Sequence, residues 1–320
     1  MFQTSSRLLI VLLIFSSMIL PQQNETKRFI AVTFDDLPIN TKYLKDGNQW
    51  IEQTEKLLSN VKKFNIPAVG FVNENKLYVN DQLDSARLKV LTMWIDADLE
   101  LGNHTFSHPD YHKTDNEIFF EDIIRGEKII KELLASKNKK LKYFRHPYLH
   151  TGNTQEKKAA LENFLKKHSY TVAPVSIDNG EWIYAFAYEK AYNQNETELM
   201  KKIGTEYINY MIDKIVYFEN QSVKLFGYEI KQILLVHSNM LNAEYFDELA
   251  GAIAQRNYSF ISLAEALTDP AYNSEDTFTG EGGISWLHRW SYTRKVDKNF
   301  FAGEPEVPKS IMDIAGIGSE

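Results

Sequence analysis

Short apolar runs alternate with longer helical patterns along most of this sequence. The run "RFIAVTF" is typical of a buried strand, and the segment after it places Leu57, Val61 and Phe64 near one face of a helix. Repeated alternation of strand and helix predicts a parallel sheet, either doubly wound or closed into a barrel. The expected strands cover residues 28–34, 67–72, 99–104, 141–147, 170–178, 230–238 and 258–267, and the expected helices cover 50–64, 88–95, 119–134, 157–168 and 243–256.

Two regions depart from this alternation. Residues 183–228 are rich in tyrosine and mostly helical in pattern, which predicts an elaborated connection beside a cleft. Residues 269–320 show no clear periodicity and form a C-terminal extension. One large domain over residues 28–268, which includes the helical insertion, is therefore the simplest organisation for this chain of 320 residues.

The N-terminal residues 1–23 have the layout of a secretory signal. One cation, Arg7, precedes a mostly apolar stretch over residues 8–20, which is short for a membrane span. The alternative is that the segment stays attached as a membrane anchor. We therefore expect a secreted or periplasmic protein, with anchoring by this segment as the other possibility.

Composition narrows the chemistry of any site. The net charge is −7 and no block of Lys or Arg stands out, so the electrostatic footprint of a nucleic-acid-binding protein is missing. Cysteine is absent, which excludes thiol nucleophiles, thiolate metal sites and disulfides. A metal ion in this protein would have to be held by histidine and carboxylate.

Ionisable residues follow five of the expected strands. Because the C-terminal ends of the strands converge on one face of a parallel barrel, we expect these groups to share one site. They are Asp35 and Asp36, His104 and His108, Arg145, Asp178 and His237.

The segment "HTFSH" supplies two imidazoles four residues apart, His104 and His108. With Asp36 they make a set of two histidines and one carboxylate, which suits zinc or another divalent transition metal with open positions. The neighbouring Asp35 would then remain free as a general base. Ordinary surface histidines, and a turn before Pro38 for one aspartate, are the alternatives without a metal.

Five segments resemble the motifs of a known family, in the same order. "TFDD", "HTFSH", "RHPY", "DNGEW" and "ILLVH" are similar to the five motifs of the polysaccharide deacetylases (carbohydrate esterase family 4, the NodB-homology domain). The resemblance spans Phe29 to Leu267. It implies an irregular (β/α) barrel with a divalent metal at its C-terminal mouth, zinc being favoured and cobalt, manganese and nickel left open.

The resemblance also implies a role for each matching residue on the metal side of the site. Asp35 would be the catalytic base and Arg145 would hold it in place. Asp36, His104 and His108 would bind the metal, which lowers the pKa of a bound water towards 7.

On the opposite side, the resemblance implies that His237 is the general acid and that Asp178 orients it. Tyr148 would offer its backbone N–H to the developing oxyanion, and Trp182 and Leu235 would line the pocket for the acetyl methyl group. An amine is a poor leaving group unless it is protonated, so an acid is needed opposite the base.

Some residues depart from the family pattern or lack a role. Leu37 stands where a glycine usually follows the paired aspartates, and His146 lies where a small or apolar residue is frequent. His112, His146, His150 and His168 lack partners at ligand spacing, so we expect surface or supporting positions for them. Two arrangements are expected for the extension. In the first, Trp286 and Trp290 pack over the bottom of the barrel. In the second, the segment reaches the cleft, where His288 or Arg289 binds substrate.

These patterns predict a metal-dependent hydrolase that removes N-acetyl, or alternatively O-acetyl, groups from a carbohydrate. A metal hydrolase acting on another non-peptide C–N bond in a small amide is the second hypothesis. A carbohydrate-binding barrel without catalysis is the third, and the presence of a base, metal ligands and an acid argues against it.

Overall fold

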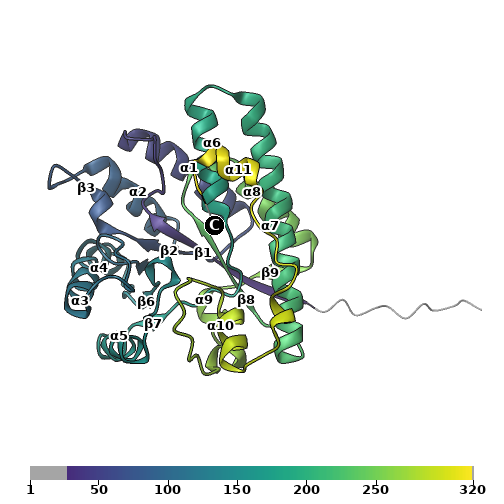
Figure 1. Ribbon diagram of the computed structural model, residues 1–320. Coiled ribbons are helices and arrows are strands. Elements are labelled where there is room, and N and C mark those ends of the chain that lie inside the picture. Colours follow the sequence, from purple (N-terminus) through teal and green to yellow (C-terminus); the bar gives the residue numbers. More distant parts are fainter. Residues whose placement is uncertain (1–26, 319–320) are drawn as a thin grey trace, which may run out of the picture.

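The computed structural model describes residues 27–318 (Figure 1). The predicted signal segment, residues 1–23, lies outside the described residues. The parallel strands of the main sheet are β1 (Arg28–Leu37), β2 (Val69–Val72), β5 (Glu100–Asn103), β6 (Tyr143–Phe144), β7 (Thr171–Val172), β8 (Gln232–His237) and β9 (Tyr258–Phe260). A small separate hairpin joins β3 (Tyr78–Val79) to β4 (Gln82–Leu83).

The main sheet is a curled, irregular barrel in which β1 pairs with three strands, β2, β8 and β9. Its strand order is β7-β6-β5-β2-β1-β8, and β9 pairs with the first residues of β1. The chain after β7 returns to β8, where Ile177 forms a parallel bridge with Leu234 and the N–H of Ser176 donates to the carbonyl of Ile233. This bridge closes the ring of strands, which confirms the predicted irregular (β/α) barrel.

Helices surround the barrel (Figure 1). Phe34 shows how they are attached, because its buried ring packs edge-on against Trp94 of one helix and Phe246 of another. The helices of the barrel are α1 (Gly47–Lys63), α2 (Ser85–Asp96), α3 (Asn116–Arg125), α4 (Lys128–Ala135), α5 (Gln155–Lys167), α8 (Met240–Gln255) and α9 (Leu263–Ala266).

Two expected elements differ from those in the structure. The helix expected over residues 119–134 is interrupted near Gly126 and forms α3 and α4. The strand expected over residues 258–267 is strand only in β9, and its second half is the short helix α9. Ser262 causes this change because its side chain caps α9 by accepting from the N–H of Glu265.

The insertion after residue 180 is a helical hairpin. It consists of α6 (Glu181–Asn193) and the long α7 (Thr197–Phe226), which pack against each other and against α8 (Figure 1). The loop that leaves β1 is fixed to α6, because the carboxylate of Glu189 accepts from the N–H groups of Lys42 and Tyr43 at 2.8 and 3.2 Å. The insertion is therefore packed into the barrel wall.

The C-terminal extension is also packed against the barrel. Its helix α10 (Trp286–Thr293) buries both Trp286 and Trp290, and its helix α11 (Lys309–Ala315) packs on α6. The N–H of Trp286 donates to the carbonyl of Val175, in the segment that closes the barrel. Arg289 is buried in an ion pair with Asp276, so the alternative in which it binds substrate is wrong.

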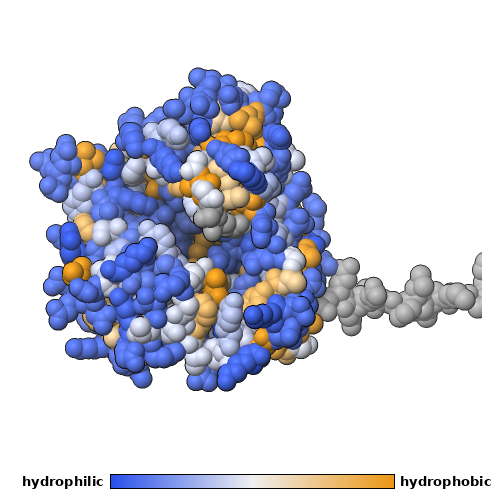
Figure 2. All heavy atoms as spheres, in the orientation of Figure 1, coloured by the Kyte–Doolittle hydropathy of each residue, from blue (hydrophilic) through white to orange (hydrophobic). Residues whose placement is uncertain are grey.

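The surface of this face is mostly hydrophilic and is hollowed near its centre, beside the end of the described chain (Figure 2). Among residues 27–318, no helix combines the length and the apolar character needed to cross a membrane.

Candidate active site

The C-terminal end of β1 carries the two adjacent carboxylates Asp35 and Asp36. Asp35 is almost fully buried, and it lies beside His237 in the register of β1 and β8. Asp36 has a φ of 66°, a left-handed conformation in which aspartate is tolerated better than most residues. This change of backbone direction sends the two side chains to different neighbours.

Asp35 is held by an arginine from the end of β6. The guanidinium of Arg145 donates to Asp35 Oδ2 at 3.2 Å and to the hydroxyl of Thr33 at 2.9 Å, and Arg145 itself is fully buried. The contact that the resemblance implies for Arg145 is therefore present. Burial raises the pKa of Asp35 to about 6, although the positive charges of Arg145 and His237 oppose the increase.

Asp36 lies with His104 and His108, which come from the loop after β5. The Nε2 atoms of His104 and His108 are 3.9 and 3.7 Å from Asp36 Oδ1, and one donor atom from each residue lies within 4.8 Å of the others. Asp36 Oδ1 is buried without a hydrogen-bond partner. Two donors on one zinc ion are roughly 3 to 3.5 Å apart, so small movements would let these residues hold a divalent ion.

The hydrogen bonds and the protonation state of the two imidazoles suit metal binding. His104 Nδ1 donates to the carbonyl of Arg145 at 2.8 Å, which leaves the lone pair of Nε2 directed towards Asp36. Burial lowers the pKa of both His104 and His108, so the rings are neutral, as metal ligands must be. The loop is held in shape because the hydroxyl of Thr105 accepts from the N–H of His108.

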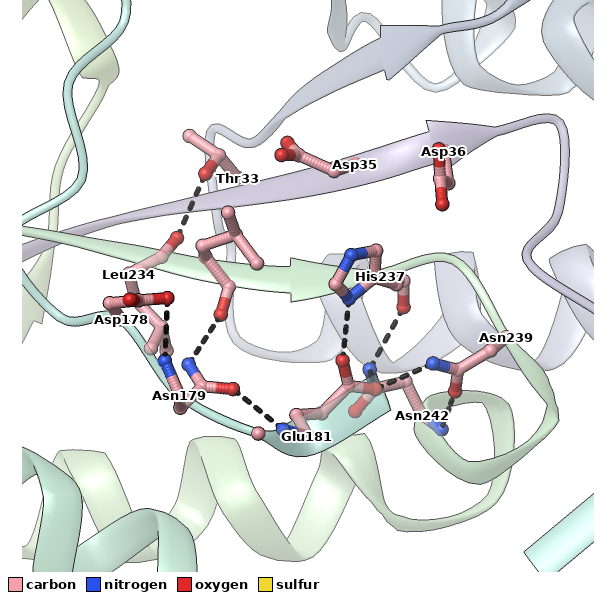
Figure 3. A network of polar contacts seen from close by, with 12 residues as sticks. Thr33, Asp35, Asp36, Asp178, Asn179, Glu181, Leu234, His237, Asn239 and Asn242 are labelled. Carbon is pink, nitrogen blue, oxygen red and sulfur yellow. Dashed lines mark hydrogen bonds and ion pairs between the residues drawn. The ribbon is translucent and has the colours of Figure 1, made fainter. Parts of the chain in front are cut away.

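His237 ends β8 and faces a buried acid on the helical hairpin. Its Nδ1 is 2.7 Å from Oε2 of Glu181, the first residue of α6 (Figure 3). The other oxygen of Glu181 accepts from the side-chain amides of Asn239 and Asn242 at 2.5 and 2.8 Å. Burial would lower the pKa of His237, but the hydrogen bond and charge of Glu181 outweigh it and raise the pKa to about 9.

The prediction that Asp178 orients His237 is wrong, because Glu181 occupies that position. Asp178 lies in the loop before α6 and accepts from the N–H of Asn179 at 2.9 Å. Its negative charge acts instead on Arg145, where it opposes the effect of burial on the pKa of the guanidinium. The signal for Glu181 is present in the sequence, since it is the second acid of the segment "DNGEW".

The three predicted substrate contacts have different surroundings. Tyr148 has a φ of 56° and is half exposed, and its ring packs edge-on against His108 with centroids 4.5 Å apart. Leu235 is buried in β8, where its carbonyl accepts from the amide of Asn179. Trp182, on the first turn of α6, is partly buried and packs against the ring of Phe186.

Lys76 is a member of the site that sequence reasoning missed. It lies on a single turn, η1 (Glu74–Leu77), and its Nζ is 3.1 Å from the carbonyl and 3.4 Å from Oδ1 of Asp36. Burial would raise the pKa of Asp36, but positive groups, Lys76 foremost, hold it well below its usual value. No motif marks Lys76, because a lysine on a short turn looks like any surface cation.

Leu37, where the family usually has glycine, is accommodated by a glycine on the next strand. Leu37 is fully buried, and a Cβ placed on Gly70 would lie 2.4 Å from Leu37 Cδ2. The side chain at position 37 therefore occupies space that Gly70 leaves open in β2.

Comparison with known proteins agrees with this geometry. Residues 22–172 match the polysaccharide deacetylase family. A peptidoglycan-N-acetylglucosamine deacetylase of Bacillus cereus is 27% identical over 158 residues, which is 49% of this chain and 47% of that protein. The match thus spans about half the length of this relative.

Two solved structures have a similar fold. A polysaccharide deacetylase from Bacillus cereus aligns with a TM-score of 0.51 at 14% identity, over 74% of this chain and 92% of that one. The chitin deacetylase of the fungus Colletotrichum lindemuthianum aligns with a TM-score of 0.50 at 19% identity, over 76% and 89%. Residues 22–172 therefore resemble the polysaccharide deacetylases, and the order of the motifs and the barrel fold agree with that resemblance.

Proposed function

We propose that this protein is a metal-dependent hydrolase that removes acetyl groups, preferentially N-acetyl, from a carbohydrate. One observation carries the proposal. A buried base, Asp35, and a positively charged acid, His237, lie side by side on β1 and β8, next to the ligand set that begins with Asp36. Amide hydrolysis by a metal-activated water uses these three parts together.

Each charged residue has a defined task in this scheme. A divalent ion held by Asp36, His104 and His108 supplies Lewis-acid activation of water and carbonyl. Asp35 takes the proton of the attacking water, and Arg145 keeps its carboxylate in position. His237, positively charged at neutral pH because of Glu181, donates a proton to the leaving nitrogen.

The other predicted contacts belong to substrate binding. We propose that the backbone N–H of Tyr148 stabilises the oxyanion, a contribution of roughly 3 kcal/mol for one such donor in other enzymes. Trp182 and Leu235 would surround the acetyl methyl group. The name of the Bacillus cereus relative supports N-acetylglucosamine as the sugar unit.

The metal and the location are further parts of the proposal. Two imidazoles and a carboxylate suit zinc, with cobalt, manganese and nickel as the other candidates. The apolar segment within residues 1–23 supports secretion or a periplasmic location, either free or anchored by that segment.

Acetate release tests the function. The purified chain is screened with defined metals against chitin-like polymers, peptidoglycan, exopolysaccharide and xylan. We expect Asp35→Asn to lower turnover by about 10²- to 10⁴-fold, as loss of a general base does. Asp98→Asn is the matched control, because the Asp98 side chain is 92% exposed and remote from the site. No acetate release from any of these substrates, or equal turnover in Asp35→Asn and the wild type, would contradict the proposal.

A further inference from the structure

A second group of potential metal ligands lies beside the candidate active site. It consists of Asp110 and His112, in the loop between β5 and α3, and His150, just after η2 (Pro147–Leu149). The ring of Tyr148 separates this group from the first, with its centroid 4.5 Å from that of His108 and 5.7 Å from that of His150. Sequence spacing did not reveal this group, because its members come from two separate loops.

The three side chains already lie close together. The rings of His112 and His150 are parallel, with centroids 3.8 Å apart, and His150 Nδ1 is 2.7 Å from Asp110 Oδ1. One donor atom of each residue lies within 4.8 Å of the other two. Donors that share one zinc ion lie roughly 3 to 3.5 Å apart, and the ion lies in the plane of each imidazole. One of the two stacked rings must therefore turn out of the stack for all three residues to bind one ion.

The ring of His112 lacks a full set of polar partners. Its side chain is only 4% exposed, and its ring nitrogens have no side-chain hydrogen-bond partner among the described residues. The backbone of Glu281 contacts one of the nitrogens, so the other is left without a partner. A buried polar group without a partner costs about 1–3 kcal/mol. The nearest opposite charge is Glu281 Oε2, 3.9 Å from His112 Nδ1, which is too far for a hydrogen bond. A bound cation would supply the missing partner.

The C-terminal extension brings a fourth ligand to the same place. A Cβ on Gly283 would lie 1.7 Å from the carbonyl oxygen of Tyr148, so only glycine allows the extension to cross this loop so closely. The crossing holds Glu281 near His112. Because the carboxylate of Glu281 is 84% exposed, it is free to turn towards an ion.

We propose that Asp110, His112 and His150, with Glu281 as fourth ligand, form a second site for a divalent transition metal. Two imidazoles and two carboxylates fill a tetrahedral shell, which is typical of a structural site, and they suit zinc, cobalt or nickel better than calcium or magnesium. The ion joins three segments: the loop after β5, the loop that carries Tyr148, and the extension. The site therefore positions Tyr148, and it does not depend on the proposed deacetylation.

The other contacts of Asp110 are compatible with this role. One of its oxygens accepts from the N–H of His112 at 3.0 Å, and the other pairs at 3.1 Å with Lys113, whose side chain is 84% exposed. A lysine in solvent is easily displaced, since exposed ion pairs contribute little. The backbone contact fixes the carboxylate without using all of its lone pairs.

Metal stoichiometry tests the second site. The full chain, stripped of metal and then loaded with Co²⁺, is analysed by elemental analysis and visible absorption. We expect two equivalents in the wild type, one in His112→Gln with the second absorption band lost, and one in His104→Gln with the first band lost. His168→Gln is the control that keeps two, because His168 only stacks on Phe164.

A variant of an exposed ligand tests the second site even if the substitution of the buried His112 prevents folding. Glu281→Gln changes an exposed side chain and leaves the fold intact, and we expect it to weaken Co²⁺ binding at the second site by about tenfold or more. A single equivalent in the wild type that is lost in His104→Gln and kept in His112→Gln, or two equivalents in His112→Gln at the wild-type affinity, would overturn the proposal. Because these readouts do not involve turnover, a failure of the deacetylase proposal remains distinguishable from a failure of this one.

Discussion

At the scale of single residues, the charge on His237 depends on one buried carboxylate. Glu181 is completely buried, and two asparagine amides satisfy the oxygen that His237 does not use. A carboxylate fixed in this way favours the imidazolium over the neutral ring. His237 thus remains protonated below about pH 9 and loses its proton above it.

Replacing Glu181 by glutamine is expected to lower the pKa of His237. The alkaline limb of the pH–rate profile then moves down by about 1 to 2 pH units, because the ring loses the charge that stabilises its protonated form. Activity near pH 6 falls less than activity near pH 8. Steady-state acetate release from pH 5 to 10 measures the shift. Asp178→Asn is the matched control, and an equal displacement of the limb in that variant would restore Asp178 as the partner of His237.

A second residue-scale prediction concerns the packing of Leu37 against Gly70. Gly70→Ala places a methyl group 2.4 Å from a Leu37 carbon, so we expect a loss of about 1–3 kcal/mol in the free energy of unfolding. Leu37→Ala in the same chain removes the clash. In a double-mutant cycle measured by urea unfolding, Gly70→Ala should therefore lower the free energy of unfolding less in the Leu37→Ala background than in the wild type. Strict additivity would show that the two side chains do not compete for space.

The residues of the site were predictable to different degrees. Asp36, His104 and His108 follow strands in a recognisable pattern, and the structure places their side chains together. The resemblance implies Asp178 as the partner of His237, but "DNGEW" holds a second acid, Glu181, and the structure places that one on the ring. His112 and His150 gave no signal, since only the fold brings their separate loops into contact.

At the scale of elements, the helical insertion is tied to the barrel through a carboxylate on α6. Glu189 is almost fully buried, and its oxygens accept from the hydroxyl of Thr41 and from the N–H groups of Lys42, Tyr43 and Leu44. These groups belong to the loop that follows the C-terminal end of β1, where Asp35 and Asp36 lie. The hairpin α6–α7 therefore fixes the backbone next to the site.

We expect Glu189→Ala to lower the free energy of unfolding by about 2–4 kcal/mol, because it removes a buried acceptor shared by the Thr41 hydroxyl and three backbone N–H groups, that of the buried Leu44 among them. Glu189→Gln keeps one carbonyl oxygen and should cost less. Glu198→Ala, on the same hairpin but with its side chain 88% exposed, is the control and should stay within about 0.5 kcal/mol of the wild type. Urea unfolding followed by circular dichroism measures all three. Equal stability of Glu189→Ala and the control would exclude this anchoring role.

Sequence patterns identified most elements but not their lengths. Alternation of apolar runs and helical faces located the strands and the main helices, since burial on both sides of a parallel strand leaves a clear signal. The run at 141–147 forms only the two-residue strand β6, because Arg145 and the residues after it turn into the site. The second half of 258–267 is a helix and not a strand, because the side chain of Ser262 caps the N-terminus of α9.

At the scale of the whole molecule, the extension is part of the barrel wall. Trp290 is 1% exposed and packs against Phe226 of α7 and Tyr272, while α11 covers α6. The sequence predicted packing for its tryptophans but not these partners, because residues 269–320 have no periodicity to indicate a face. The contacts predict that barrel and extension unfold together.

Trp290→Ala should therefore lower the stability of the entire chain, by about 3–5 kcal/mol, in one cooperative transition. Coincident curves from tryptophan fluorescence and far-ultraviolet circular dichroism are the expected result. Lys309→Ala, at a side chain that is 82% exposed, serves as the control with little change. Two separate transitions, with only the first affected by Trp290→Ala, would show that the extension unfolds independently.

The hydrogen bond from Trp286 to Val175 has a consequence for synthesis of the protein. The two residues are joined across the closing segment of the barrel but lie far apart along the chain. A ribosome that adds about 5–20 residues per second needs several seconds to pass from one to the other. During that interval the carbonyl of Val175 lacks this partner, and the segment that closes the barrel is without the cover that α10 later provides.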